Sequence, residues 1–148
     1  MSFTFIIGAI VAYLLGSIPS GLWVGQYFFK KDIRQYGSGN LGSTNAFRVL
    51  GKKAGSLVLF CDIFKGFLAM ILALTIFKQP DISPLWIASF AVIGHTFPIF
   101  ASFKGGKAVA TFAGMILAYQ PLLLLYGLII FLVLLAITRM VSLTAMVT

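Results

Sequence analysis

The 148-residue chain is 60% hydrophobic, 9% of its residues are charged, and its formal net charge is +8. Soluble domains use about 45–50% apolar and about 25% charged residues, so this composition excludes an ordinary soluble domain and indicates an integral membrane protein. One cysteine, one histidine and three acidic residues exclude a disulfide framework and leave little room for a metal site, so we expect no metal and no cofactor.

Apolar segments of about 20 residues, the length that crosses a bilayer as a helix, recur along the chain. The first covers residues 3–29, and Pro19 and the small residues in its inner half are expected to kink it or to let neighbouring helices approach closely. A polar, glycine-rich connection follows, over residues 30–53. Further spans are predicted at 54–77, 84–100, 108–119 and 121–138, and residues 140–148 begin another apolar segment. The sequence therefore predicts an all-α, polytopic integral membrane protein, with about five transmembrane helices in a single membrane domain, 1–148.

The fourth of these spans is too short to cross a membrane if it begins after Lys107. Either its helix runs on from residues 103–107, or the span is broken or tilted, with an irregular end buried in the protein. Non-helical backbone at membrane depth is tolerated only when it is buried in this way or lines a water-filled cavity.

Positive charges gather on alternate connections between the predicted spans. Those of the first and third connections, and the one that follows the fifth span, are Lys30, Lys31, Arg34, Arg48, Lys52, Lys53, Lys104, Lys107 and Arg139. The second connection carries Lys78 against Asp81, and the fourth carries no charge. The positive-inside rule then places the N-terminus outside and both glycine-rich connections in the cytoplasm. The positive net charge is thus a sign of topology, and we expect no nucleic-acid partner.

A dense set of hydrogen-bonding residues lies in the first connection, within residues 37–48. Three glycines are interspersed there with polar side chains, namely Ser38, Asn40, Ser43, Thr44, Asn45 and Arg48. Glycine lets backbone N–H groups approach an anion, and arginine offers a two-pronged donor for phosphate. Two interpretations stay open: a phosphate site, or a flexible turn in which Thr44 or Asn45 caps the following helix.

The second cationic segment follows the third span. It begins with His95, three residues before Pro98, and reads Phe-Lys-Gly-Gly-Lys over residues 103–107. Its lysines either meet anionic lipid headgroups, at about 1 kcal/mol each near the surface, or form a phosphate site with backbone N–H groups of the glycines between them. His95 is either a packing residue or part of that site. The candidate binding residues here are Lys104, Gly105, Gly106 and Lys107.

Two ionisable side chains fall inside the second predicted span. Asp62 and Lys65 are three residues apart, so they face each other on one side of a helix. Ionisable groups at membrane depth are functional candidates by default. The alternatives are a mutually neutralised structural pair, or an Asp62 bonded to the first glycine-rich connection. We expect Asp62 to orient a basic group of the site. Ser142, three residues after Arg139, is either a helix cap or a further hydroxyl of the same pocket.

These segments resemble the acyl-phosphate-dependent glycerol-3-phosphate acyltransferases of bacterial membranes, the PlsY-type family, and the resemblance spans nearly the whole chain. The matching segments are residues 16–21 (Gly-Ser-Ile-Pro-Ser-Gly), 37–48, 62–66 (Asp-Ile-Phe-Lys-Gly), 94–98 (Gly-His-Thr-Phe-Pro), 103–111 and 141–143 (Val-Ser-Leu). Two motifs of several residues each lie as far apart in this sequence as they do in the family, which argues against chance agreement.

The resemblance implies the first acylation of bacterial phospholipid synthesis, at the cytoplasmic face of the cell membrane. A fatty acyl group passes from acyl phosphate to sn-glycerol 3-phosphate, giving lysophosphatidic acid and phosphate, so the implied partners are these substrates and membrane lipid. Carried over by position, Ser38, Arg48, Lys107 and Ser142 hold the phosphates, with His95 and Asn45 nearby. The candidate catalytic residues are His95, Lys107 and Ser38. The wider binding set adds Gly39, Asn40, Thr44, Asn45, Lys104, Gly105 and Gly106, with Asp62 and Lys65 in support.

The residues themselves favour a mechanism of positioning and electrostatics. Membrane acyltransferases that use acyl-CoA often carry a His-x4-Asp pair, but residue 100, five after His95, is phenylalanine, and we expect no acid near His95 to orient it as a base. Acyl phosphate contains a good leaving group and its own basic oxygens. We therefore expect cations and N–H groups to hold both phosphates while the acceptor hydroxyl attacks the carbonyl and a substrate oxygen takes the proton.

Other classes stay open on the sequence alone. Members of the family are commonly longer, with further spans and a third motif containing His and Asn, so the chain is expected to be a fragment or a shortened, inactive relative. A small channel or transporter for anions such as phosphate would also use a broken span and cationic loops, although no polar stripe crosses the bilayer here. A non-catalytic membrane scaffold is the third class.

Overall fold

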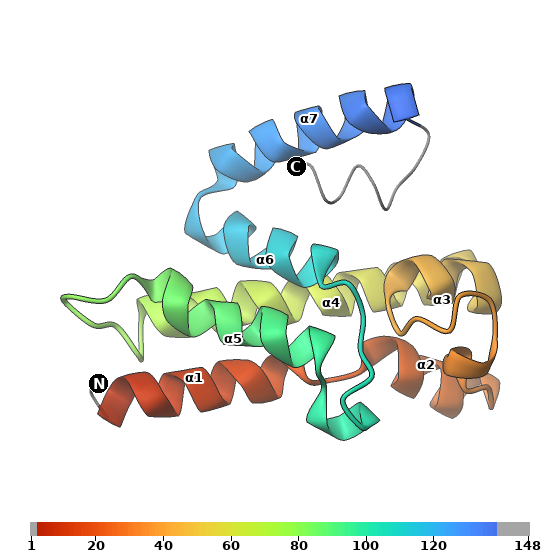
Figure 1. Cartoon of the computed structure of the whole chain (residues 1–148), viewed down its shortest axis with the longest axis horizontal. Coiled ribbons are helices and arrows are strands. Elements are labelled where there is room, and N and C mark those ends of the chain that lie inside the picture. Colours follow the sequence, from red (N-terminus) through yellow and green to blue (C-terminus); the bar gives the residue numbers. More distant parts are fainter. Residues whose placement is uncertain (1–2, 139–148) are drawn as a thin grey trace.

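The structure, a computed structural model, describes residues 3–138, with side chains up to residue 134; Arg139, Ser142 and the apolar segment 140–148 lie outside the described residues. All regular structure within that range is helical (Figure 1), as the sequence predicts. The helices are α1 (Phe3–Gly16), α2 (Ser20–Phe29), α3 (Ser43–Leu50), α4 (Lys52–Leu74), α5 (Pro84–Thr96), α6 (Val109–Tyr119) and α7 (Pro121–Thr138), with short 3-10 turns η1 (Ile33–Gln35) and η2 (Ile99–Ala101).

Within the part of the chain that the structure describes, three helical segments are long and apolar enough to cross a membrane, namely Phe3–Phe29, Lys52–Leu74 and Pro84–Ala101. Two further apolar helices, Val109–Tyr119 and Pro121–Leu134, are shorter. The first three predicted spans are therefore confirmed as helical segments of spanning length. The total of about five spans and the outside position of the N-terminus stay predictions.

The first span is broken between α1 and α2. Pro19 lacks a backbone N–H and disfavours helical backbone at the residue before it, so the helix ends at Gly16 and restarts at Ser20. The kink predicted at Pro19 is thus confirmed as a full interruption. Because the interruption frees backbone carbonyls in a buried region, other groups must hydrogen-bond to them.

Small residues let the long helices approach closely. In Figure 1, α1, α4 and α5 run alongside one another, and α6 lies against α4. A Cβ added at Gly16 would collide with the backbone of Ala91 in α5, and one added at Gly94 would collide with that of Tyr13 in α1. Between α4 and α6, a Cβ at Gly66 would collide with the carbonyl of Thr111. Close packing of backbones through small residues is a common way in which membrane helices associate.

The start of the short fourth span is irregular. Residues 102–108 are not helical, Gly106 and Ala108 are buried, and α6 begins only at Val109. A helix running on from residues 103–107 is therefore wrong, and the alternative of an irregular, buried end is confirmed.

An apolar cluster holds the first connection in place. Ile33 and Leu41, from the loop itself, are buried together with side chains of α2, α3 and α4, namely Leu22, Ala46, Leu50 and Val58. This cluster anchors the glycine-rich loop on the ends of three helices, so its polar atoms have defined positions.

Candidate functional site

Asn45 organises the first glycine-rich loop. Its side chain is buried, its Oδ1 accepts a hydrogen bond from the N–H of Ser38 at 3.0 Å, and its Nδ2 donates to the carbonyls of Ile33, Tyr36 and Asn40 at 3.0–3.1 Å. These bonds engage both ends of the amide. Asn45 therefore shapes the loop from beneath, which is neither the helix cap nor the direct phosphate contact that the sequence left open.

The glycines of this loop are needed where the backbone turns. Gly37 and Gly39 have φ angles of +61° and +71°, in the left-handed region that glycine adopts without strain. A side chain at Gly37 would also collide with Oδ1 of Asn45, and the Arg48 stem lies alongside the same glycine. Arg48 is exposed in the last turn of α3, so it can reach a ligand beside this turn.

The second cationic loop is built on His95. The N–H of Gly106 donates to the carbonyl of His95 at 3.1 Å, and a Cβ added at Gly106 would collide with Nε2 of His95. A Cβ added at Gly105 would collide with the His95 carbonyl. Any side chain at either glycine would displace this loop, so the two glycines permit its close approach to His95.

A buried network joins the interruption of the first span to α4 and α5. Asp62 Oδ1 lies 2.9 Å from Lys65 Nζ, accepts a hydrogen bond from the Ser20 hydroxyl at 3.0 Å, and lies 3.6 Å from Nδ1 of His95. Lys65 also donates to the carbonyl of Ile18 at 2.9 Å, which the break at Pro19 has freed. The network confirms the Asp62–Lys65 pair and extends it to the base of the second loop.

The position of Asp62 corrects one expectation about His95. The sequence pattern suggested that no acid lies near His95, because the nearby chain contains none. The structure places Asp62, 33 positions earlier in the chain, within 3.6 Å of the His95 ring. The acid comes from a neighbouring helix, so local spacing could not reveal it.

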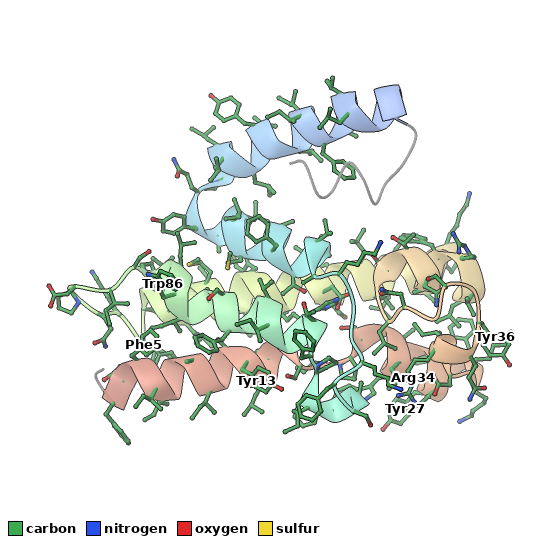
Figure 2. All side chains as sticks on the ribbon, in the orientation of Figure 1. Phe5, Tyr13, Tyr27, Arg34, Tyr36 and Trp86 are labelled. Carbon is green, nitrogen blue, oxygen red and sulfur yellow. The ribbon has the colours of Figure 1, made fainter. Side chains whose placement is uncertain are left out.

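The two loops meet at one cleft of about 350 Å³. Gly39 comes from the first loop and Lys104 from the second, and the other lining residues are Asp32, Arg34 and Gln35. Gly39 and Lys104 thus line one cleft, whereas a phosphate site formed by the two loops stays a prediction. Arg34 and Tyr36 of the first connection, and Tyr27 of α2, lie toward one end of the molecule (Figure 2).

An ion pair at this cleft was not among the predicted site residues. Asp32 accepts hydrogen bonds from Nε and Nη2 of Arg34, the shortest at 2.6 Å, and also caps η1 by accepting from the Arg34 N–H. Hydrogen bonds from Arg34 lower the pKa of Asp32, and those to Asp32 raise the pKa of Arg34. The spacing Asp-x-Arg just before the glycines was the available signal, whereas the charge pattern of the connections indicates only a topology role for Arg34.

The remaining candidates are distributed around the loops. Ser38, Thr44 and Lys107 are exposed, and none of them lines the cleft. The Asn40 side chain accepts from the N–H of Gly42 at 2.8 Å and so helps to shape the loop. Ser142 lies outside the described residues. In the part of the chain that the structure describes, no group of three or more His, Cys, Asp or Glu side chains is arranged to hold a metal ion.

Apolar helices of spanning length define a multi-pass helical membrane protein, in which two glycine-rich, cationic loops meet near one end. The chain belongs to the glycerol-3-phosphate acyltransferase family, whose model matches residues 6–148. The resemblance inferred from the motifs is thereby confirmed.

Similar proteins extend this match over most of the chain. A glycerol-3-phosphate acyltransferase of Enterococcus faecalis is 61% identical over 139 residues, which cover 94% of this chain and 64% of that protein. A glycerol-3-phosphate acyltransferase of Listeria welshimeri is 55% identical over 149 aligned residues, which cover 99% of this chain and 75% of that protein. The chain thus spans about two thirds to three quarters of the length of these relatives.

Solved structures agree with the fold. The crystal structure of PlsY, an integral membrane glycerol 3-phosphate acyltransferase, in its glycerol 3-phosphate form has a TM-score of 0.86 and 39% identity, covering 95% of this chain and 70% of that one. The lysophosphatidic acid form of the same enzyme gives a TM-score of 0.83 and 38% identity.

Proposed function

We propose that the protein transfers a fatty acyl group from acyl phosphate to sn-glycerol 3-phosphate, giving lysophosphatidic acid and phosphate, at the cytoplasmic face of the bacterial cell membrane. The observation that carries the proposal is the meeting of the two glycine-rich, cationic loops at one cleft. Membership of the glycerol-3-phosphate acyltransferase family and likeness to a PlsY structure in its glycerol 3-phosphate form support the reaction and the acceptor.

The phosphate ligands belong on the exposed face of the loops. The side chains of Ser38, Arg48, Lys104 and Lys107 are exposed, and they are the proposed donors. Such donors stabilise the charge that develops on the carbonyl oxygen and on the leaving phosphate, and they hold the acceptor close to the carbonyl. Ser142 and the remaining loop residues, Thr44, Gly105 and Gly106, complete the proposed set.

We assign His95 a positioning role beneath the second loop. Its ring is buried between Asp62 and the backbone of Gly106, and its carbonyl holds the Gly106 N–H. Asp62 and Lys65 fix His95 in turn. In this arrangement a basic oxygen of the substrate phosphate accepts the proton of the attacking hydroxyl, and the protein supplies orientation and charge.

The test removes one predicted phosphate contact at a time. In the purified protein, Arg48→Ala and Lys107→Ala are each expected to lower kcat/KM for acyl transfer by about a hundredfold or more, the range seen when a single donor to developing charge is lost. Transfer is measured as lysophosphatidic acid formed from acyl phosphate and radiolabelled glycerol 3-phosphate.

Lys53→Ala is the matched control, because Lys53 is an exposed cation of the same connection, at the start of α4. It is expected to stay within about twofold of the parent protein, since exposed charges away from a site contribute little. Near-normal transfer by both Arg48→Ala and Lys107→Ala would remove the proposal.

A further inference from the structure

The carboxyl-terminal end of α5 supports the second cationic loop. The last carbonyls of a helix have no partner within the helix, so they need donors from elsewhere. The carbonyl of His95 accepts the N–H of Gly106 at 3.1 Å. A Cβ added at Gly105 would collide with the carbonyls of His95 and Thr96, so the loop lies directly on this helix end. The position of the loop therefore depends on how the end of α5 is held.

One group that holds this end comes from α1, 84 positions earlier in the chain. The hydroxyl of Tyr13 (Figure 2) donates to the carbonyl of Phe97, the residue that ends α5, at 2.9 Å. The two helices are in backbone contact at the same place, since a Cβ added at Gly94 would collide with the carbonyl of Tyr13. A single hydroxyl thus joins the first span to the base of the second loop.

The turn that follows Phe97 can transmit this position to the loop. Pro98 has a restricted φ angle, and its carbonyl accepts the N–H groups of Ala101 and Phe103 at 3.1 and 2.9 Å. Residues 98–103 therefore form a closed turn, and Lys104 follows it directly. A shift at the Phe97 carbonyl would move this turn and the lysine after it.

The same turn contains strained backbone. Ser102 and Phe103 have φ angles of +56° and +59°, in the left-handed region that disfavours residues with a side chain. Such strain persists only where surrounding contacts fix the backbone. The turn is therefore expected to relax when a contact at its base is lost.

We propose that Tyr13 is a positioning residue for acyl transfer, which holds the turn 98–103 and the loop after it through the carbonyl of Phe97. The network of Asp62 acts at a different point, because it reaches the ring of His95. Tyr13 also lies outside the sequence motifs that indicated the site. The proposal rests on the proposed function and deepens it, although the hold on the loop can be tested without acyl transfer.

The first experiment measures how readily trypsin cleaves each connection of the purified protein in nanodiscs of phosphatidylcholine. Trypsin cleaves after lysine, so cleavage after Lys104 or Lys107 reports on the second loop. Cleavage after the exposed Lys30 or Lys31 reports on the rest of the fold. Tyr13→Phe removes only the hydroxyl, and it is expected to raise cleavage of the second loop about three- to tenfold relative to the first connection, as loss of one hydrogen bond predicts. A general loss of stability would raise both together.

Two further variants frame this result. Tyr27→Phe removes the same hydroxyl from a tyrosine of the same span that is 72% exposed, and it is expected to change the cleavage ratio less than about twofold. Gly106→Ala should displace the loop from His95 and raise the ratio. Adding Tyr13→Phe to Gly106→Ala should raise it little further, because both changes act on one loop.

The second experiment measures acyl transfer at saturating concentrations of both substrates. Tyr13→Phe is expected to lower kcat about three- to tenfold, because a displaced loop holds the reacting groups less well in the transition state. Tyr27→Phe is expected to keep the kcat of the parent protein within about twofold.

Each contrary outcome has a distinct meaning. An unchanged cleavage ratio in Tyr13→Phe overturns the inference, and so does an equal rise at both connections, which would give Tyr13 a role in overall stability only. A raised ratio with normal kcat overturns the positioning role and leaves the proposed function standing. Absence of acyl transfer in the parent protein would remove the proposed function and the positioning role with it, whatever the cleavage ratio.

Discussion

The residue with the most demanding environment is Asp62. Its carboxylate is 1% exposed and lies among Ser20, Lys65 and His95, all of them buried. A charge buried this deeply is tolerated only when it is paired and hydrogen-bonded, and loss of one partner leaves the other charge uncompensated. Asp62 and Lys65 should therefore behave as one unit.

This coupling predicts non-additive effects on stability. Asp62→Asn and Lys65→Met are each expected to destabilise the protein by about 3–5 kcal/mol, because each leaves a buried charge without its partner. The double variant should lose clearly less than the sum of the two, since it buries no uncompensated charge. Denaturant unfolding in detergent micelles, followed by circular dichroism, measures the three values. Additive losses would show that the two side chains act independently.

Single residues also show where prediction from the sequence succeeded and where it stopped. Asp62 and Lys65 were predictable as a pair, because charges in an apolar span are rare and three-residue spacing places them on one helix face. The role of Asn45 was not predictable, since it depends on three carbonyls that converge only when the loop has folded. The approach of Asp62 to His95 is a contact between helices, which no local pattern encodes.

Among the helices, the interruption at Pro19 supplies hydrogen-bonding groups to the buried network. It frees the Ile18 carbonyl for Lys65 and brings the Ser20 hydroxyl to Asp62. Proline and its small neighbours predicted a disturbance at this point of the span, but not the partners that make the disturbance tolerable. The same limit applies to α6, whose short length was evident from the sequence, while its irregular, buried start required the structure.

The contact between α4 and α6 leads to a prediction about glycine. A methyl group at Gly66 would collide with the carbonyl of Thr111, and one at Gly114 would collide with that of Ile63, so the two backbones would have to separate. Gly66→Ala and Gly114→Ala are each expected to cost about 1–3 kcal/mol, as overpacking does. The loss of stability is measured as a lower midpoint of thermal unfolding in detergent.

Gly127→Ala is the matched control for this pair. Gly127 lies in α7, and no atom of the described residues, apart from its chain neighbours and its own helix backbone, lies within 4 Å of the position that an added methyl group would occupy. Alanine has the better helix propensity, so the thermal midpoint should stay equal or rise slightly. Tolerance of alanine at Gly66 and Gly114 equal to that at Gly127 would mean that the two helices are not in backbone contact.

At the scale of the whole molecule, the two ends of the long axis carry different parts of the chain. Phe5 and Trp86 lie at one end, and Arg34 and Tyr36 lie at the other (Figure 2). The helix α4 connects the two ends: its 23 residues extend about 35 Å at 1.5 Å per residue, enough to cross a hydrocarbon core of about 30 Å. If α4 crosses the bilayer, the residues just before and just after it must be reached from opposite sides of the membrane.

Which side faces the cytoplasm can be tested with a pair of cysteines on α4. In a Cys61→Ser background, Lys53→Cys places an exposed thiol at the start of α4, and Lys78→Cys places one shortly after its end. A membrane-impermeant maleimide should label the Lys78→Cys variant in intact bacterial cells, and the Lys53→Cys variant only after permeabilisation, because cations concentrate on the Lys53 side. The reverse pattern would invert the topology and turn the cleft away from the cytosolic pool of phosphorylated acceptors. Labelling of both variants from one side would mean that α4 does not cross, and a substrate cleft at a membrane surface would lose its structural basis.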